Sequence, residues 1–187
     1  LKPIRQAQGL SDNRRQIQND KGIKRIRINR VHMEEDTGKL LHQKIDGKNC
    51  TLIDFNRSGV PLVEIVSEPD IHSSSEAKEY LKKIQQIIRF LGVSDADMEK
   101  GSMRLEPNIS ILIGRDAKYC VSTNKYKLPN YKVEIKNINS FRFAQDAINY
   151  EIQRQFTMLK NGEKIKQETR RWNEEKKETY SQRDKGE

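Results

Sequence analysis

The sequence has few of the residues on which secreted, metal-binding and membrane proteins depend. Its two cysteines, Cys50 and Cys120, are too few and too far apart for a disulfide framework or a cysteine-rich zinc site. No apolar run approaches the roughly 20 residues that cross a membrane. No glycine-rich phosphate loop follows a predicted strand, which argues against a Rossmann or P-loop nucleotide site. These absences favour a reducing, cytoplasmic setting without a membrane partner.

Aromatic residues and activated nucleophiles are also scarce. Phe, Trp and Tyr together make up 6% of the chain, whereas single-stranded RNA bases are usually stacked on aromatic rings. No serine or cysteine stands in an arrangement with histidine and a carboxylate, so acyl-enzyme hydrolysis is not expected. Any nucleic acid is therefore expected to be held through its phosphates and its shape.

Charge is the most abundant feature. Lys and Arg number 36 against 27 Asp and Glu, which gives a net charge of +9, and the mean hydropathy is −0.93. A basic surface suits a polyanion such as RNA or nucleotide phosphates, although a solvated lysine-rich surface has the same composition. A chain of 187 residues is long enough for one domain with a real core. We predict a poorly ordered or atypical segment at 1–22 and the folded domain at 23–187.

Apolar periodicity predicts two long helices among several strands. One stripe at helical spacing runs from Ala77 to Leu91 and is ended by Gly92, and a second runs from Ala144 to Leu159. Ser73 is expected to cap the first helix, and Asn139 or Ser140 the second. The predicted strands are 23–36, 39–45, 50–56, 60–68, 101–113, 119–121 and 131–138, with a final ribbon that turns near 173–177.

The turns between these strands indicate how they pair. Asp46-Gly47 is a hairpin turn signal, and Arg57-Ser58-Gly59 is expected to join 50–56 and 60–68 as a hairpin. Such turns are too short for parallel crossovers. The sequence therefore predicts an α+β fold with a mostly antiparallel sheet.

Two predicted strands have the same polar pattern on one face. Arg104, Glu106 and Asn108 alternate with apolar residues on one strand, and Glu134 and Lys136 do so on the other. If the strands are neighbours, carboxylates that hold Mg²⁺ converge with cations that bind phosphate, as phosphoryl transfer requires. The alternative is a set of cross-strand ion pairs on a solvated sheet face.

A further acidic group lies at the end of the first predicted strand. Strand parity sets Glu35 on the face of Arg25 and Arg27, and a bulge would exchange the two faces. The opposite face has His32, Glu34 and Asp36. A lone strand histidine is more often packed than a metal ligand.

Four long motifs, in order, resemble one enzyme family. They are "RVHMEEDTGKLLH", the stretch from "DFNRSGVPLVEIVSEPDIHSSSEAKEYLKKI" to "GSMRLEPNISI", "VEIKNINSFRFAQDAINYEIQRQ" and "GEKIKQETRRWNE". Together they resemble the B subunit of the aspartyl/glutamyl-tRNA amidotransferases. The resemblance runs from about Lys24 to the end of the chain.

The resemblance implies a ligase that repairs misacylated tRNA. Glu-tRNA(Gln) or Asp-tRNA(Asn) is phosphorylated by ATP with Mg²⁺ and then aminated by ammonia. The amidotransferase A subunit is expected to release that ammonia from glutamine, and the C subunit to join the other two in a heterotrimer; no DNA partner is expected. The implied fold is part of a glutamine-synthetase-like cradle in a bacterial-type cytoplasm, or an organellar matrix in a eukaryote. Because the family's first strand and its helical tail have no counterpart here, the chain is expected to be an excised piece that is inactive alone.

The resemblance also implies roles for single residues. The family's acidic metal ligands correspond to Glu35, Glu106 and Glu134. Charge and position add phosphate or substrate contacts, with Asn108 and Lys136 toward ATP. The catalytic candidates are Arg104, Lys136 and Arg170.

Two other functions fit the same sequence. One is a non-catalytic RNA-binding or scaffold part of the same complex, in which the acidic face is only structural. The other is a different glutamine-synthetase-like ligase that acts on a small carboxylate. Unchanged amidation after substitution of Glu106 or Glu134 by Gln in a full-length complex would indicate the first. ATP consumption stimulated by free glutamate, without dependence on tRNA, would indicate the second.

Overall fold

The protein, in a computed structural model, combines two helices with short and long strands. The structure describes residues 23–113, 119–120 and 128–184, so the predictions for 1–22 lie outside it. Every strand pair in these residues is antiparallel except β8–β9, which confirms the α+β prediction. The elements are β1 (Ile28–Glu35), β2 (Lys39–Ile45), β3 (Lys48–Asp54), β4 (Pro61–Ser67), α1 (Ser74–Phe90), β5 (Asn108–Ile109), β6 (Leu112–Ile113), β7 (Tyr119–Cys120), β8 (Val133–Lys136), α2 (Phe141–Lys160), β9 (Glu168–Asn173) and β10 (Glu178–Asp184).

Both helices begin and end where their sequence signals predict. The Ser73 hydroxyl accepts a hydrogen bond from the Glu76 backbone N–H at 3.2 Å. Gly92 follows α1 with a φ of +68°, a conformation that glycine adopts without strain. Ser140 caps α2 by accepting a hydrogen bond from the Phe143 N–H at 3.1 Å. Neither helix has the length and apolarity that a membrane-spanning segment needs.

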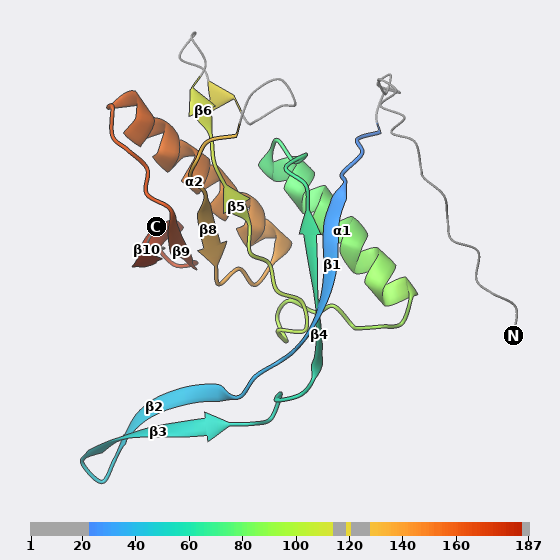
Figure 1. Cartoon of the computed structure of the whole chain (residues 1–187), viewed down its shortest axis with the longest axis vertical. Helices are drawn as coiled ribbons and strands as arrows, with labels where there is room; N and C mark the ends of the chain where they lie inside the picture. Colours follow the sequence, from blue (N-terminus) through green and yellow to red (C-terminus); the bar gives the residue numbers. More distant parts are fainter. Residues whose placement is uncertain (1–22, 114–118, 121–127, 185–187) are drawn as a thin grey trace, which may run out of the picture.

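A four-stranded sheet in the order β10-β9-β8-β5 forms the centre of the body. β8 and β9 are parallel, and α2 connects them. A parallel pair requires a long crossover, which explains why a helix of this length separates the two strands. α2 lies along one face of this sheet (Figure 1).

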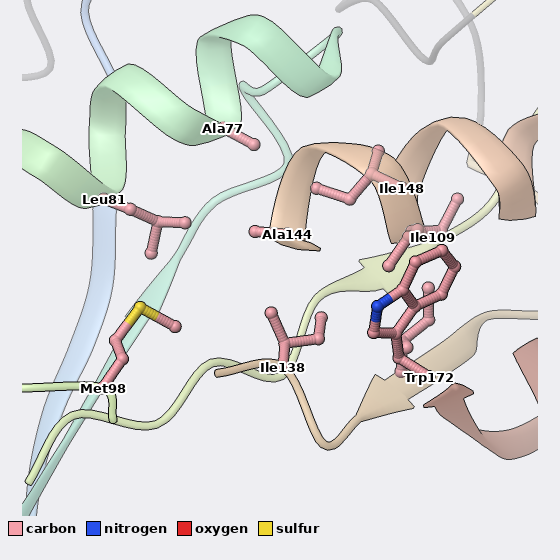
Figure 2. Packing of buried hydrophobic residues seen from close by; sticks show 10 residues of the cluster. Ala77, Leu81, Met98, Ile109, Ile138, Ala144, Ile148 and Trp172 are labelled. Carbon is pink, nitrogen blue, oxygen red and sulfur yellow. The ribbon is translucent and has the colours of Figure 1, made fainter. Parts of the chain in front are cut away.

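The core lies between the two helices and the sheet. In Figure 2, Ala77 and Leu81 of α1 face Ala144 of α2, with Met98 below them. Trp172 of β9 lies under α2 and is almost completely buried. The predicted helical stripes therefore meet in one core.

Two two-stranded ribbons lie outside the four-stranded sheet, and one of them, β2–β3, projects away from the body (Figure 1). β1 pairs with β4, and β2 pairs with β3, so the predicted hairpin between 50–56 and 60–68 is wrong. Asp46 and Gly47 close the β2–β3 hairpin with φ values of +49° and +77°, as the Asp-Gly signal predicts. The 57–59 turn packs against the end of β1 instead: the Gly59 N–H donates to the Asp36 carbonyl at 2.9 Å, and the Asp36 N–H to the Val60 carbonyl at 2.8 Å. The β2–β3 hairpin is thus an insertion between paired strands β1 and β4.

The predicted strand 101–113 is shorter than expected. Only Asn108–Ile109 and Leu112–Ile113 are strands. Residues before them form a loop in which the Ser102 N–H donates to the Asp97 carbonyl at 2.9 Å. Pro107 has no N–H to donate to a ladder, although its carbonyl accepts a hydrogen bond from the Ile135 N–H of β8 at 3.0 Å. The alternation survives even so, because Met103 and Leu105 pack on the core while Glu106 is exposed.

Candidate functional site

The face of the four-stranded sheet opposite α2, called here the open face, holds the central residues of the predicted site. β8 alternates, so Val133 and Ile135 are buried toward the helix while Glu134 and Lys136 point to the open face. Asn108 of β5 is the register partner of Glu134 and lies on the same face. The two strands are therefore neighbours, which was the condition for their polar faces to meet.

Lys136 lies between two carboxylates on this face. Its Nζ donates to Glu106 Oε1 at 3.1 Å and is 3.7 Å from Glu134 Oε1. Lys136 and Glu106 are partly exposed to solvent, whereas Glu134 is 9% exposed. One ammonium group thus contacts two carboxylates on this face.

Thr169 of β9 completes the surroundings of Glu134. It is the register partner of Glu134 in the parallel β8–β9 pair, and its hydroxyl donates to Glu134 Oε2 at 3.0 Å. The sequence prediction missed this residue. Alternation along β9 was the available signal, because it sets Thr169 and Arg171 on one face and Glu168, Arg170 and Trp172 on the other.

Arg104 contacts the end of the β1–β4 ribbon. Its Nη2 is 3.0 Å from Asp36 Oδ2, and Arg57 Nε approaches the same oxygen at 3.2 Å. Asp36 therefore joins the ribbon to the loop that holds Glu106. Arg104 and Glu106 also line a pocket of about 240 Å³ between this loop and residues 137–139.

Arg170 lies on the face of the sheet that packs against α2. It is the register partner of Ile135. Its Nη1 donates to Glu168 Oε1 at 2.9 Å, and its Nε donates to the Thr179 hydroxyl at 2.8 Å and lies 3.6 Å from Glu151 Oε2. The structure therefore does not bring Arg170 together with Glu106 and Lys136.

The surroundings of Arg170 form a buried charge network. Glu151 is fully buried and accepts hydrogen bonds from Arg154 Nη2 at 2.7 Å and from Gln155 Nε2 at 2.9 Å. Burial alone raises the pKa of Glu168, but hydrogen bonds from Ser181 and Arg170 and the charge of Arg154 outweigh it, so that the pKa is lowered. These contacts hold β9 and β10 against α2.

Arg171 occupies the position on the open face that the prediction gave to Arg170. It is the register partner of Lys136, it is exposed, and its Nη2 donates to Asn137 Oδ1 at 3.3 Å. The prediction chose Arg170 from its charge and its expected face, and did not consider Arg171. Because side chains alternate along a strand, Arg170 and Arg171 lie on opposite faces of the sheet.

Glu35 ends β1 on a face that the parity prediction assigned wrongly. The register shifts between Ile28 and Arg30, and this bulge sets Glu35 with Ile28 and Met33. Glu35 is exposed beside Pro61.

Among the residues that the structure describes, no three His, Cys, Asp or Glu side chains lie close enough to hold one metal ion. Of the three predicted metal ligands, Glu106 and Glu134 are brought together, and Glu35 is not part of their group.

The sequence from residue 2 to 187 matches the family described as the GatB/GatE catalytic domain. The chain belongs to this family. A relative from Roseiflexus sp. (strain RS-1), named as the B subunit of an aspartyl/glutamyl-tRNA(Asn/Gln) amidotransferase, is 49% identical over 170 residues, which are 91% of this chain and 32% of the relative. A relative of the same name from Thermosipho melanesiensis is 50% identical over 166 residues, 88% of this chain and 33% of the relative.

A third relative has a narrower name. It is the B subunit of the glutamyl-tRNA(Gln) amidotransferase in the organellar chromatophore of Paulinella chromatophora, and it is 48% identical over 165 residues, 87% of this chain and 31% of the relative. The chain thus spans about a third of the length of these curated relatives. Their names confirm the family resemblance read from the motifs, and because each is named as one subunit, they indicate an enzyme built from several subunits.

The site residues of this family member suit a magnesium ion that is also bound by a substrate phosphate. Mg²⁺ in proteins is often held by one or two carboxylates, several waters and phosphate oxygens. Glu106 and Glu134 supply two carboxylates, and the Lys136 ammonium already lies between them as a cation does. Two carboxylates of this kind fit a Mg²⁺ ion whose other ligands are waters or further oxygens.

Proposed function

We propose that the open face is the part of a tRNA-dependent amidotransferase at which ATP activates the misacylated tRNA. The substrates are Glu-tRNA(Gln), Asp-tRNA(Asn) or both. The observation that supports this proposal is Lys136 between Glu106 and Glu134 on an open sheet face. Family membership and the names of the relatives support it independently.

The reaction has two chemical steps, phosphorylation of the carboxylate and then its amination. First, the side-chain carboxylate of the aminoacyl group attacks the γ-phosphorus of ATP, which forms an acyl phosphate and releases ADP. Then ammonia attacks the acyl carbon, phosphate leaves, and the amide remains after loss of a proton. The first step brings anions together, so it needs fixed positive charge.

The residues of the open face divide this work. Glu106 and Glu134 hold Mg²⁺, which offsets phosphate charge when bound. Lys136 keeps the two carboxylates together and contacts phosphate oxygen, and Asn108 offers an amide on the same face. Arg104, beside the 240 Å³ pocket, contacts the substrate. Glu35 and Arg170 do not lie with these residues in the structure, so a role for either at the site requires a conformational change.

The proposal includes partner proteins and a cellular setting. Ammonia comes from glutamine hydrolysed by the amidotransferase A subunit, and the C subunit holds the A and B subunits together as a heterotrimer in the cytoplasm or an organellar matrix. The net charge of +9 suits tRNA as the polyanionic partner. These points rest on the family and on charge.

The experiment substitutes the two carboxylates in the full-length protein, assembled with its partner subunits. Glu106→Gln and Glu134→Gln keep the shape of the side chain and remove its charge. We expect each to lower ATP-dependent amidation of misacylated tRNA by about a hundredfold or more, since they remove charge stabilisation at the reacting phosphate. Glutamine hydrolysis by the partner protein should persist, because it does not use these two carboxylates.

The matched control is Glu79→Gln on α1. Glu79 is an exposed glutamate paired with Lys82 at 2.9 Å, far along the chain from the open face. It should amidate tRNA as the unsubstituted enzyme does. If Glu106→Gln and Glu134→Gln also retain full amidation, the catalytic proposal is wrong and the RNA-binding or scaffold function is favoured. Consumption of ATP with free glutamate and without tRNA would favour a small-molecule ligase.

A further inference from the structure

We propose that Thr169 is a positioning residue that fixes the orientation of the Glu134 carboxylate. Its hydroxyl donates to Glu134 Oε2 at 3.0 Å, while Glu134 Oε1 is turned toward Lys136 Nζ, 3.7 Å away. The two oxygens thus have separate partners. The inference rests on the proposed function, because it assigns a residue that prepares Glu134 for its cation.

A carboxylate needs such a partner because its last torsion is soft. The terminal torsion of glutamate is broad and roughly two-fold, so the two oxygens exchange places at little cost. A hydrogen bond to one oxygen selects one plane and leaves the other oxygen aimed at the cation. Partners of this kind commonly change metal affinity or activity by about 10- to 100-fold.

Burial makes this hydrogen bond strong and lasting. Thr169 is 3% exposed and Glu134 9%. With so little water at these groups, a buried carboxylate gains more from a protein donor than an exposed one does. The parallel β8–β9 register places the two side chains next to each other on the open face.

The neighbours of Thr169 fix its backbone from the other face of the sheet. Glu168 and Arg170 flank it, and both point into the buried network around Glu151. Their ion pairs hold β9 against α2, so the Thr169 hydroxyl is presented at one place. A buried network on one face thereby supports the site on the opposite face.

The test replaces the hydroxyl by a methyl group of the same size. Thr169→Val is made in the full-length protein assembled with its partner subunits, and Mn²⁺ serves as the probe ion, measured by electron paramagnetic resonance in the presence of ATP. We expect Mn²⁺ to bind about tenfold more weakly or worse. The Mg²⁺ concentration for half-maximal amidation should rise by a similar factor, while kcat at saturating Mg²⁺ changes less. Thr169→Ser should restore both values, because it keeps the hydroxyl.

Thr179→Val is the matched control. Thr179 is equally buried, at 3% exposure, and donates to Glu151 Oε2 at 3.1 Å on the α2 face. This variant should unfold more readily but bind Mn²⁺ within about twofold of the unsubstituted protein, because it leaves the carboxylates of the open face unchanged. If Thr179→Val weakens Mn²⁺ binding as much as Thr169→Val, the effect is general loosening and the inference is wrong. Where the valine variant does not fold, Thr169→Ser and Thr169→Ala make the same comparison, since they differ by the hydroxyl alone.

Glu134→Gln separates failure of this inference from failure of the proposed function. If Glu134→Gln loses Mn²⁺ binding and amidation while Thr169→Val keeps both, only the role of Thr169 is overturned. If Glu134→Gln binds Mn²⁺ and amidates tRNA normally, the proposed function and this inference both fail. If Glu134→Gln and Thr169→Val both weaken Mn²⁺ binding and the serine variant recovers it, the inference stands.

Discussion

The four-stranded sheet of the body and the two-stranded ribbons both have regular strands with β-branched residues, but these residues differ in solvent exposure. Ile135 on β8 is 0% exposed, whereas Ile53 on β3 is 54% exposed. Both residues are β-branched and lie on regular strands. The difference is the layer above them: α2 covers one face of the four-stranded sheet, and within the described residues no element covers the β2–β3 ribbon (Figure 1). A strand pattern therefore predicts which residues share a face, and a second layer decides whether that face is buried.

Charged pairs differ between the two regions in the same way. Arg154 and Glu151 in the body are 2.7 Å apart with the carboxylate fully buried, and Arg30 and Glu64 in the β1–β4 ribbon are 3.0 Å apart with both side chains about half exposed. Exposed pairs contribute at most about 1 kcal/mol. Loss of one partner from a buried pair leaves an uncompensated charge and costs far more. Breaking an ion pair of the same kind therefore costs more stability in the body than in the ribbon.

Removal of the buried Glu151 carboxylate is expected to lower the free energy of unfolding most. Glu151→Ala removes one of the two carboxylates that Arg154 and Arg170 share, and Glu168 alone remains for both, so we expect the free energy of unfolding to fall by about 3–5 kcal/mol. Urea unfolding followed by the fluorescence of Trp172, the only tryptophan, measures this loss. Glu64→Gln in the ribbon is the control and should change the free energy by about 0.5 kcal/mol or less. Equal losses in the two variants would contradict the comparison.

The second effect concerns the two isoleucines. Ile135→Ala opens a cavity between β8 and α2, and we expect a loss of about 2–5 kcal/mol in the free energy of unfolding. Ile53→Ala removes side-chain atoms that are already half in water, so a loss of about 1 kcal/mol or less is expected. The same urea titration measures both. A similar loss for Ile53→Ala would show that the ribbon is covered in solution.

The smallest effect is a change in pH dependence. The pKa of Glu168 is lowered from 4.5 in the folded protein, so its ion pairs stabilise the fold above about pH 4.5 and this stability is lost as the pH falls through the lowered value. We expect Glu168→Gln to cost about 1–2 kcal/mol at neutral pH. The difference from the unsubstituted protein should shrink in acid, as measured by urea titrations from about pH 7 to about pH 3, a range that includes the usual glutamate pKa. A difference that stays constant over this range would contradict the assignment.

Local patterns were sufficient where one chain segment decides its own structure. The limits of α1 and α2 follow from serine caps, glycine ends and apolar stripes. The alternation of β8, which sets the side chains of Glu134 and Lys136 on one face, likewise follows from the local sequence. These features depend on backbone geometry within a few residues, so the sequence states them directly.

Three features could not be predicted in this way. A single bulge near Asn29 reversed the face of Glu35. Strands β1 and β4, separated by a whole hairpin, pair with each other in preference to the short 57–59 turn connection. Arg170 points into the α2 network although Arg171, next to it, lies on the open face. Each of these features depends on which distant segment of the chain pairs with the strand or packs against it.

The sequence by itself determined the helices, the turns, the alternation of the strands and membership in the GatB/GatE catalytic-domain family. Tertiary structure alone decided which acids meet, because a carboxylate on a strand has a fixed face but no fixed neighbour until the strands assemble. Glu106 reaches Lys136 and Glu134 only because β5 and β8 pair, and Thr169 reaches Glu134 only because α2 returns the chain beside β8. Short-range geometry is encoded along the chain, whereas contacts between distant segments follow from the packing of the whole core.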